Sequence, residues 1–247
     1  MPRYDFKSPR LFVDAPLAQN AVLELDRNQA NYLLNVLRLK PQQTVLVFNG
    51  TDGEWLADIE SPGRKKATLR LQSQTRDQGR KPILDYVFAP LKQARLDYMV
   101  QKAVEMGASD LRPVLTQYTQ VRKLNTDRMR ANAIEAAEQC GILNLPTIHE
   151  PALLNDYLSN LDHRISLIFC DESDAGQSPL DALKNLNPES LAVLIGPEGG
   201  FSEEERKTLI EMANVTAIPL GPRVLRADTA AVAALALVQA KFGDWQN

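Results

Sequence analysis

Hydrophobic and polar positions follow two different rhythms along this chain of 247 residues. Up to about residue 75, short β-branched runs are separated by turn sequences such as "NGTDGE". Runs of this kind are typical of strands joined by tight turns. The pattern predicts five strands, within residues 10–13, 21–25, 43–50, 54–60 and 66–73, and one helix over 27–40 that Asp26 caps. Short strands with a single helix favour a small barrel.

After residue 82 the rhythm changes to apolar strands that alternate with helices. Near-continuous apolar runs, each followed by a loop, span residues 83–91, 164–172, 191–196 and 215–221. Helices are expected over 94–108, with Gly107 as the stop, and over 127–140, 203–213 and 229–241, with another ending near residue 158. This alternation predicts a parallel sheet covered on both faces, with ligand sites at the carboxyl ends of its strands. The polar stretch Ser73–Pro82 is the expected linker, so we predict domains at 1–75 and 76–247.

Composition limits the class of protein. Hydrophobic residues make up 44% and charged residues 24%, as in soluble globular proteins. We expect a cytoplasmic protein, because no stretch reaches the apolar length of a membrane span and the first residues do not form a signal peptide. Cys140 and Cys170 lie in apolar periodic segments and are expected to be reduced core residues. We expect no protein-bound metal, since His149 and His163 have no partner at metal-ligand spacing.

Charge is unevenly spread over a net value of −3. Residues 1–82 contain 13 Lys and Arg against 9 Asp and Glu, while the remainder contains 15 against 22. Two interpretations are open. The first part contacts a polyanion, or it has an ordinary solvated surface.

The segment "LAVLIGPEGGFSEEER" (191–206) joins a buried strand to a helix through a loop with three glycines. Ser202 and Glu205 form a capping box that starts the helix. The loop lacks the lysine of a phosphate-binding loop, and Glu198 with the three glutamates 203–205 would repel a pyrophosphate. A ligand that lies against bare backbone and carries positive charge fits better, and S-adenosylmethionine meets that description. A tight turn in which glycines supply positive φ is the alternative.

A second loop repeats the pattern in "AIPLGPRVLRADTAAVAALALVQ" (217–239). Gly221 and Pro222 follow a strand, and Asp228 or Thr229 is expected to cap the next helix. Arginines beside a helix start are solvated, ion-paired or catalytic, and the pattern leaves this open for Arg223 and Arg226. From 230 to 238 the helix is apolar on every side, which predicts burial in the core or against a partner subunit.

Together the two loops resemble motifs of the SPOUT methyltransferases, and the match is closest to the RsmE family, which methylates N3 of a uridine in 16S ribosomal RNA of the small subunit. The segments "RLFV", "NVLRLK", "QKAVEMGA" and "AAEQCG" support the resemblance. It implies a PUA-like RNA-binding β-barrel, then a SPOUT α/β domain with a parallel sheet and a C-terminal trefoil knot. It also implies S-adenosylmethionine as cofactor and a homodimer with a shared site.

The chain departs from the family pattern at three places. Asn31 and Tyr32 stand where a histidine is common, residues 141–143 replace a segment that usually has an arginine, and Asp228 replaces a glutamate. Two other functions therefore stay open: a SPOUT ribose 2′-O-methyltransferase, or an RNA-binding ribosome-assembly factor without catalysis.

Roles follow for individual residues. We expect Arg226 to stabilise charge on a carbonyl oxygen of the uridine. Glu198 is either the general base, an electrostatic contact of the cation, or a loop carboxylate bonded to nearby N–H groups. The expected cofactor contacts are Leu194, Gly196, Pro197, Glu198, Gly199, Gly200, Leu220, Gly221, Leu225, Arg226 and Thr229. The expected RNA contacts are Arg3, Lys7, Arg10, Arg38, Lys40 and Lys92, with a further basic turn at 64–66.

Overall fold

The computed structural model of the protein describes residue 5 and residues 7–60, 67–171, 178–184, 186 and 188–246. The chain divides into two compact units. The first comprises Met1–Arg80 together with Ala137–Leu145, and the second comprises Lys81–Ala136 together with Pro146–Asn247. The predicted boundary after residue 75 stays a prediction, but the structure adds a second segment to the first unit. In that segment, Glu138 Oε1 accepts a hydrogen bond of 2.8 Å from the backbone of Phe12.

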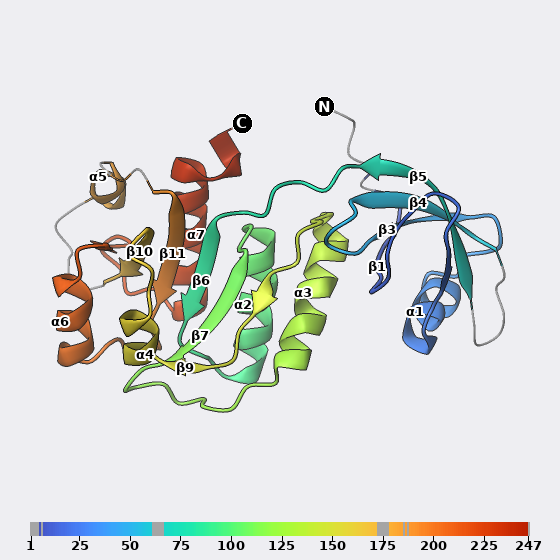
Figure 1. Ribbon diagram of the computed structural model, residues 1–247. Helices are drawn as coiled ribbons and strands as arrows, with labels where there is room; N and C mark the ends of the chain where they lie inside the picture. Colours follow the sequence, from blue (N-terminus) through green and yellow to red (C-terminus); the bar gives the residue numbers. More distant parts are fainter. Residues whose placement is uncertain are drawn as a thin grey trace. The chain divides into compact units, whose positions relative to one another are not determined.

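The described residues of the first unit contain a mixed five-stranded sheet in the order β1-β3-β4-β5-β2 (Figure 1). β1 runs parallel to β3, and the other neighbours are antiparallel. Each strand lies where the pattern predicts one, but β5 continues through residues 73–76, which were expected to belong to the linker. The strands are β1 (Arg10–Phe12), β2 (Val22–Glu24), β3 (Thr44–Phe48), β4 (Glu54–Ile59) and β5 (Thr68–Arg76).

The helix of this unit is shorter than expected. Asp26 caps α1 (Arg27–Asn31) as predicted, and Gln29 completes the capping box. A π-helical turn, η1 (Tyr32–Val36), continues the helix, with the N–H of Leu37 bonded to the carbonyl of Tyr32. The predicted end at Lys40 is wrong, because Arg38 adopts a φ of 55° that no right-handed helix continues.

A buried ion cluster links β1 to the rest of the sheet. Arg10 Nε lies 3.0 Å from Glu54 Oε2, and the two residues are 5% and 2% exposed. Arg76 Nε and Thr75 Oγ1 also donate to Glu54, over 3.1 Å and 3.0 Å. Burial raises the pKa of Glu54, but Arg76, with Thr75 and Arg10, more than offsets that effect, so the pKa is lowered. Arg10 was expected to contact RNA, and the structure places its guanidinium inside the protein instead.

The second unit contains the predicted parallel sheet. Its described strands follow the order β12-β10-β11-β6-β7-β8, and β9 pairs with β7 (Figure 1). Every pairing is parallel. The strands are β6 (Leu84–Phe88), β7 (Asp110–Leu115), β8 (Thr147–Ile148), β9 (Ala152–Leu153), β10 (Ile165–Cys170), β11 (Ser190–Ile195) and β12 (Val215–Ile218).

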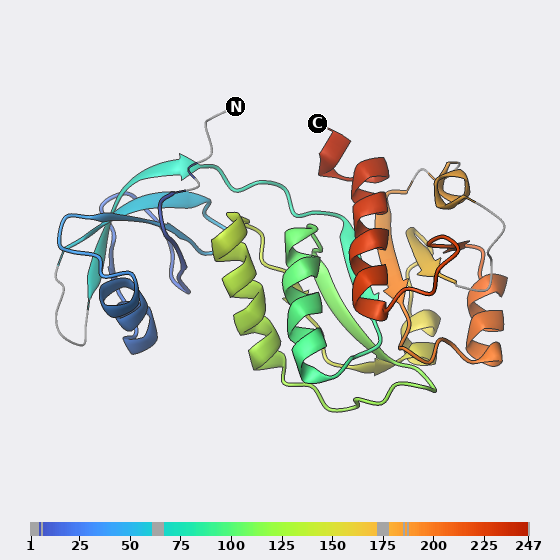
Figure 2. The same cartoon turned by 180° about the vertical axis from the view of Figure 1, so that it is seen from behind.

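Helices cover both faces of this sheet. Figure 2 shows α2, α3 and α7 side by side over one face. On the other face, Leu154 and Leu158 of α4 and Leu209 of α6 share a core cluster with Leu167, Leu194 and other strand residues. The helices are α2 (Gln93–Glu105), α3 (Thr126–Cys140), α4 (Leu154–Ser159), α5 (Pro179–Leu183), α6 (Glu203–Glu211), α7 (Ala227–Phe242) and the 3₁₀ turn η2 (Asp244–Gln246).

Three local predictions have clear outcomes. Gly107 has a φ of 76° directly after α2, as its predicted stop role requires. The predicted cap of α7 is wrong: Arg226 is the N-cap, and Asp228 lies inside the first turn. Cys140 is exposed at the end of α3, so the expectation of a core cysteine is also wrong there. Among the described helices, none is long and apolar enough to cross a membrane.

Candidate active site

The carboxyl ends of three neighbouring strands lie side by side at one end of the parallel sheet. β10 lies between β12 and β11, and all three run in the same direction. β11 enters the first glycine loop, β12 enters the second, and β10 ends at Cys170 and Asp171. In the sheet the two glycine loops therefore flank the end of β10.

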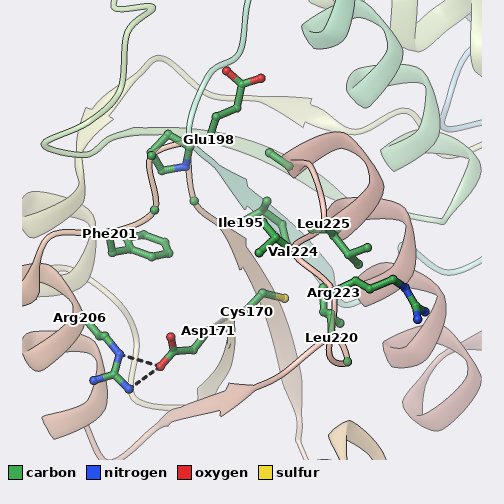
Figure 3. Close-up of a pocket in the computed structure, with 17 residues that line it drawn as sticks. Cys170, Asp171, Ile195, Glu198, Phe201, Arg206, Leu220, Arg223, Val224 and Leu225 are labelled. Carbon is green, nitrogen blue, oxygen red and sulfur yellow. Dashed lines mark hydrogen bonds and ion pairs between the residues drawn. The ribbon is translucent and has the colours of Figure 1, made fainter. Parts of the chain in front are cut away.

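These segments line a cavity of about 170 Å³ (Figure 3). Its wall is contributed by the end of β10, the first loop, one side chain of α6, the second loop and the start of α7. The lining residues are Cys170, Asp171, Ile195, Gly196, Pro197, Glu198, Gly199, Gly200, Phe201, Arg206, Leu220, Gly221, Arg223, Val224, Leu225, Ala227 and Ala230.

The first loop needs its glycines for two different reasons. Gly200 has a φ of 70°, and its N–H closes a turn on the carbonyl of Pro197 over 2.9 Å. At Gly196 a Cβ would lie 2.7 Å from the ring of Phe201. That ring packs edge-on against Phe169, with 5.3 Å between the centroids. The loop can therefore turn sharply and also bring bare backbone to the cavity.

The first loop leads into α6 through the predicted capping box. Ser202 Oγ accepts from the N–H of Glu205 over 3.2 Å, and Glu205 Oε2 accepts from the N–H of Ser202 over 2.9 Å. The other carboxylate oxygen of Glu205 accepts from the N–H of Gln117 over 2.7 Å. The two carboxylate oxygens of Glu205 thus connect the end of the first loop to the segment that follows β7.

Gly221 determines the shape of the second loop. Its φ is 95°, and a Cβ added there would meet no heavy atom within 4 Å in the described part of the protein. Val224, although apolar, is 84% exposed and lines the cavity.

The Glu198 side chain is turned away from the cavity that its backbone lines (Figure 3). It forms an ion pair with Arg95 of α2. Both side chains are partly exposed, at 42% and 38%. Of the roles expected for Glu198, this geometry favours a loop carboxylate, with an arginine as its partner rather than N–H groups.

Arg226 begins α7 and lies between two cavity residues, Leu225 and Ala227. Its own side chain does not belong to the lining as the structure describes it. The guanidinium is 61% exposed, and Nη2 donates to Asp228 Oδ2 over 2.8 Å. The guanidinium is therefore accessible to a ligand and is oriented by one carboxylate.

Two charged residues that the sequence reasoning missed meet inside the cavity. Asp171 is 5% exposed, and Arg206 Nε and Nη2 each lie 2.8 Å from its Oδ2. The neighbouring thiol of Cys170 has its pKa raised to about 12 by burial, so it stays protonated. The signal for Asp171 was present, since it follows a predicted parallel strand at the edge where ligands bind.

Comparisons with known proteins agree with this geometry. A family model described as RNA methyltransferase domain matches residues 80–239, and one described as RNA methyltransferase PUA domain matches residues 25–72. The ribosomal RNA small subunit methyltransferase E of Rickettsia conorii is 33% identical over 234 residues, which cover 94% of this chain and 96% of that protein. The chain belongs to the ribosomal RNA small subunit methyltransferase E family.

Two solved structures of similar proteins share the fold. The methyltransferase E of Neisseria gonorrhoeae, bound to S-adenosylmethionine, aligns with a TM-score of 0.84 and 25% identity over 94% of this chain and 97% of that one. A protein of Legionella pneumophila, in complex with the same cofactor, aligns with a TM-score of 0.83 and 28% identity, covering 95% of this chain and 98% of that one. Both likenesses extend over both units.

The residues expected to contact the cofactor in this methyltransferase family member separate into two groups. Eight line the cavity: Gly196, Pro197, Glu198, Gly199, Gly200, Leu220, Gly221 and Leu225. Three do not line it as described: Leu194, which is buried in the core, Arg226 at the helix start, and Thr229, which is exposed in the first turn of α7. The glycine loops were therefore a better guide than the strand and helix that flank them.

The expected RNA contacts are also divided. Lys7, Arg38, Lys40 and Lys92 are exposed. Lys92 lines a small hollow together with Tyr118 and residues 197–199. Arg10 is buried, as described above, and Arg3 and the basic turn at 64–66 lie outside the described residues.

Proposed function

We propose that this protein transfers a methyl group from S-adenosylmethionine to N3 of a uridine in 16S ribosomal RNA of the small subunit, in the cytoplasm. The observation that carries the proposal is one cavity lined by both glycine loops, in a chain of the methyltransferase E family. The names of the relatives support ribosomal RNA of the small subunit as substrate. The resemblance of the two loops supports N3 of a uridine.

The residues present fit S-adenosylmethionine. Backbone is accessible at Gly221, where a Cβ would meet open space, and along the first loop. The acids of the lining, Asp171 and Glu198, are each paired with an arginine. The lining has no lysine to hold a phosphate among the residues described. When bound, this cofactor supplies a methyl group on a positively charged sulfur, and loops 196–201 and 220–225 would hold it.

Uridine presents a chemical problem that Arg226 can solve. N3 carries a proton at neutral pH, and it becomes nucleophilic once that proton has passed to solvent water. Arg226 would donate hydrogen bonds to a carbonyl oxygen next to N3 and stabilise the developing anion. Asp228, 2.8 Å from the guanidinium, positions it. Positioning of the two reactants contributes a further several kcal/mol.

Glu198 is assigned a supporting role in this proposal. As a general base, its carboxylate would first have to leave Arg95 and turn toward the cavity. We therefore propose that the backbone of Glu198 contacts the cofactor, and that its side chain holds the loop against α2 through Arg95.

RNA binding is assigned to exposed basic side chains. Lys7, Arg38 and Lys40 of the first unit would contact phosphates and position the substrate without selecting the base. In the second unit, Lys92 beside the first loop would hold a phosphate near the reacting nucleotide. The match of residues 25–72 to a PUA domain of RNA methyltransferases supports this division of labour.

We also propose a homodimer that buries the open side of α7. Val232, Ala233, Ala236 and Leu237 of this helix are partly exposed in the single chain, whereas Ala234 and Leu235 are buried. An apolar stripe on a helix that begins at the cavity would be covered by a second copy. The resemblance to the family supports the same arrangement.

The finer fold assignments are part of the proposal. The mixed sheet of the first unit would close into a PUA-like barrel. The second unit would be a SPOUT domain whose segment after β12 forms a trefoil knot. Its support is the strand order, in which β12 lies beyond β10 while α7 returns to pack on α2.

Nucleoside analysis of ribosomal RNA from a strain that lacks the gene tests the function. We expect 3-methyluridine to disappear from 16S ribosomal RNA and to return with the wild-type gene. Loss of a 2′-O-methylated nucleoside with 3-methyluridine intact would assign the enzyme to ribose methylation. An unchanged nucleoside profile would indicate a binding factor without this activity.

A further inference from the structure

The end of β10 carries a buried carboxylate to which the proposed reaction assigns no role. Asp171 is 5% exposed and lines the cavity between the two glycine loops. A buried carboxylate stays charged when it has partners that replace water. Figure 3 shows it on the cavity wall, with both marked contacts from Arg206 ending on one of its oxygens.

Asp171 is held in place from two sides. Arg206 of α6 approaches Oδ2 with Nε and Nη2, each over 2.8 Å. The backbone N–H of Asp171 donates to the carbonyl of Ile218 at the end of β12, over 3.0 Å. The side chain and the main chain are thus fixed before a ligand arrives, so little ordering cost remains for binding.

The charge of this pair indicates which ligand groups it would accept. Asp171 is already neutralised by Arg206, so a further cation, such as the ammonium of an amino acid, would leave an excess positive charge in a buried place. Neutral donors add no such excess. Adenine offers an amino group, but its neighbouring ring nitrogen is an acceptor that a carboxylate repels. A ribose offers two adjacent hydroxyl donors.

We propose that Asp171 accepts hydrogen bonds from the ribose hydroxyls of S-adenosylmethionine, and that Arg206 is the positioning residue. This inference rests on the proposed function, because it takes that cofactor as the ligand. In this arrangement the Asp171 carboxylate at the end of β10 is a side-chain acceptor for the ribose, and the glycine loops supply backbone groups that contact the rest of the cofactor. Hydrogen bonds to a charged acceptor are the stronger kind, so this contact selects for a ribose with both hydroxyls.

The test measures binding rather than methylation. Calorimetry would compare S-adenosylhomocysteine with its 2′-deoxy and 3′-deoxy analogues on wild-type protein, Asp171→Ala and Asp171→Asn. We expect Asp171→Ala to weaken S-adenosylhomocysteine at least about tenfold. Loss of at least one hydroxyl should weaken binding to wild type about fivefold or more, and binding to Asp171→Ala by less than about twofold.

Asp97→Asn is the matched control, because Asp97 forms the same kind of pair with Arg128 on α2 and α3, outside the cavity. It should bind all three ligands as wild type does. The proposal is overturned if both deoxy analogues bind wild type as well as the parent compound does, a result that needs no variant. It is also overturned if the hydroxyl dependence survives undiminished in Asp171→Ala, which has no acceptor at this position. A wild-type protein that binds none of the three ligands would overturn the proposed function itself.

Discussion

Gly221→Ala isolates the contribution of bare backbone to the cavity. Gly221 has a φ of 95°, and the added methyl group would meet no described atom within 4 Å. The folded state therefore bears backbone strain without a clash, at a cost of about 1–2 kcal/mol. For a chain of this size that corresponds to a fall in Tm of roughly 2–8 °C. The methyl group also occupies space that the cofactor would use, so we expect its affinity to fall at least about tenfold, or about 1.4 kcal/mol.

The matched control is Gly50→Ala in the first unit. Gly50 has a φ of 88°, and an added Cβ would make an ordinary contact of 3.8 Å with the carbonyl of Leu143. It bears the same kind of strain but lies outside the cavity. Both variants should lose similar stability, and Gly221→Ala alone should lose affinity.

Calorimetry and thermal unfolding with S-adenosylmethionine provide the assay. At a ligand concentration of about 100 times the wild-type Kd, wild type gains about 2.7 kcal/mol and a variant that binds tenfold more weakly gains about 1.4 kcal/mol. Equal affinity of Gly221→Ala and wild type would refute the idea that the cofactor lies against this backbone. So would an equal loss of affinity in Gly50→Ala.

Three further predictions concern catalysis, stability and assembly. Arg226→Ala should lower kcat about a hundredfold with little change in cofactor affinity; normal turnover would make this arginine structural. Glu54→Gln removes the buried carboxylate that faces Arg10 and Arg76 and should cost about 3–5 kcal/mol in urea unfolding at pH 7, against less than about 1 kcal/mol for Glu60→Gln on the surface. Because the folded pKa of Glu54 is lowered, the stability that its carboxylate contributes is present above pH 4.5 and is lost as pH falls through the folded pKa. A difference in stability between wild type and Glu54→Gln that persists below the folded pKa would contradict the stabilising role of the carboxylate. Leu237→Glu should convert a dimer to monomers in sedimentation; a monomeric wild type would refute the interface.

Much of the fold follows from local pattern. The strands β10, β11 and β12 are short apolar runs that enter polar loops, and each lies where the periodicity places it. The N-cap at Asp26 and the capping box at Ser202 follow from side chains that satisfy helix N–H groups three residues on. Such features depend on neighbours in sequence, so a sequence alone predicts them well.

The predictions that fail concern residues whose burial or contacts depend on residues distant in the sequence. Arg10 resembles a surface arginine in the sequence, because Glu54, its buried partner, lies 44 positions away. Residues 137–140 are the last turn of α3, whose earlier residues belong to the second unit, yet the contact of Glu138 with Phe12 lies in the first. Asp171 ends a strand like many acids, and its pairing with Arg206 depends on the packing of α6. Tertiary contacts of this kind do not appear in the hydrophobic periodicity of the sequence.

The most direct test of the central claim is methylation of 16S ribosomal RNA by the purified protein with S-adenosylmethionine that carries an isotopically labelled methyl group. Both free RNA and the small ribosomal subunit should be offered as substrate, and the nucleosides should then be analysed by mass spectrometry. We expect labelled 3-methyluridine with at least one of the two substrates, and its loss with Arg226→Ala. Label found in 2′-O-methylated nucleosides alone, or no label with either substrate, would contradict it.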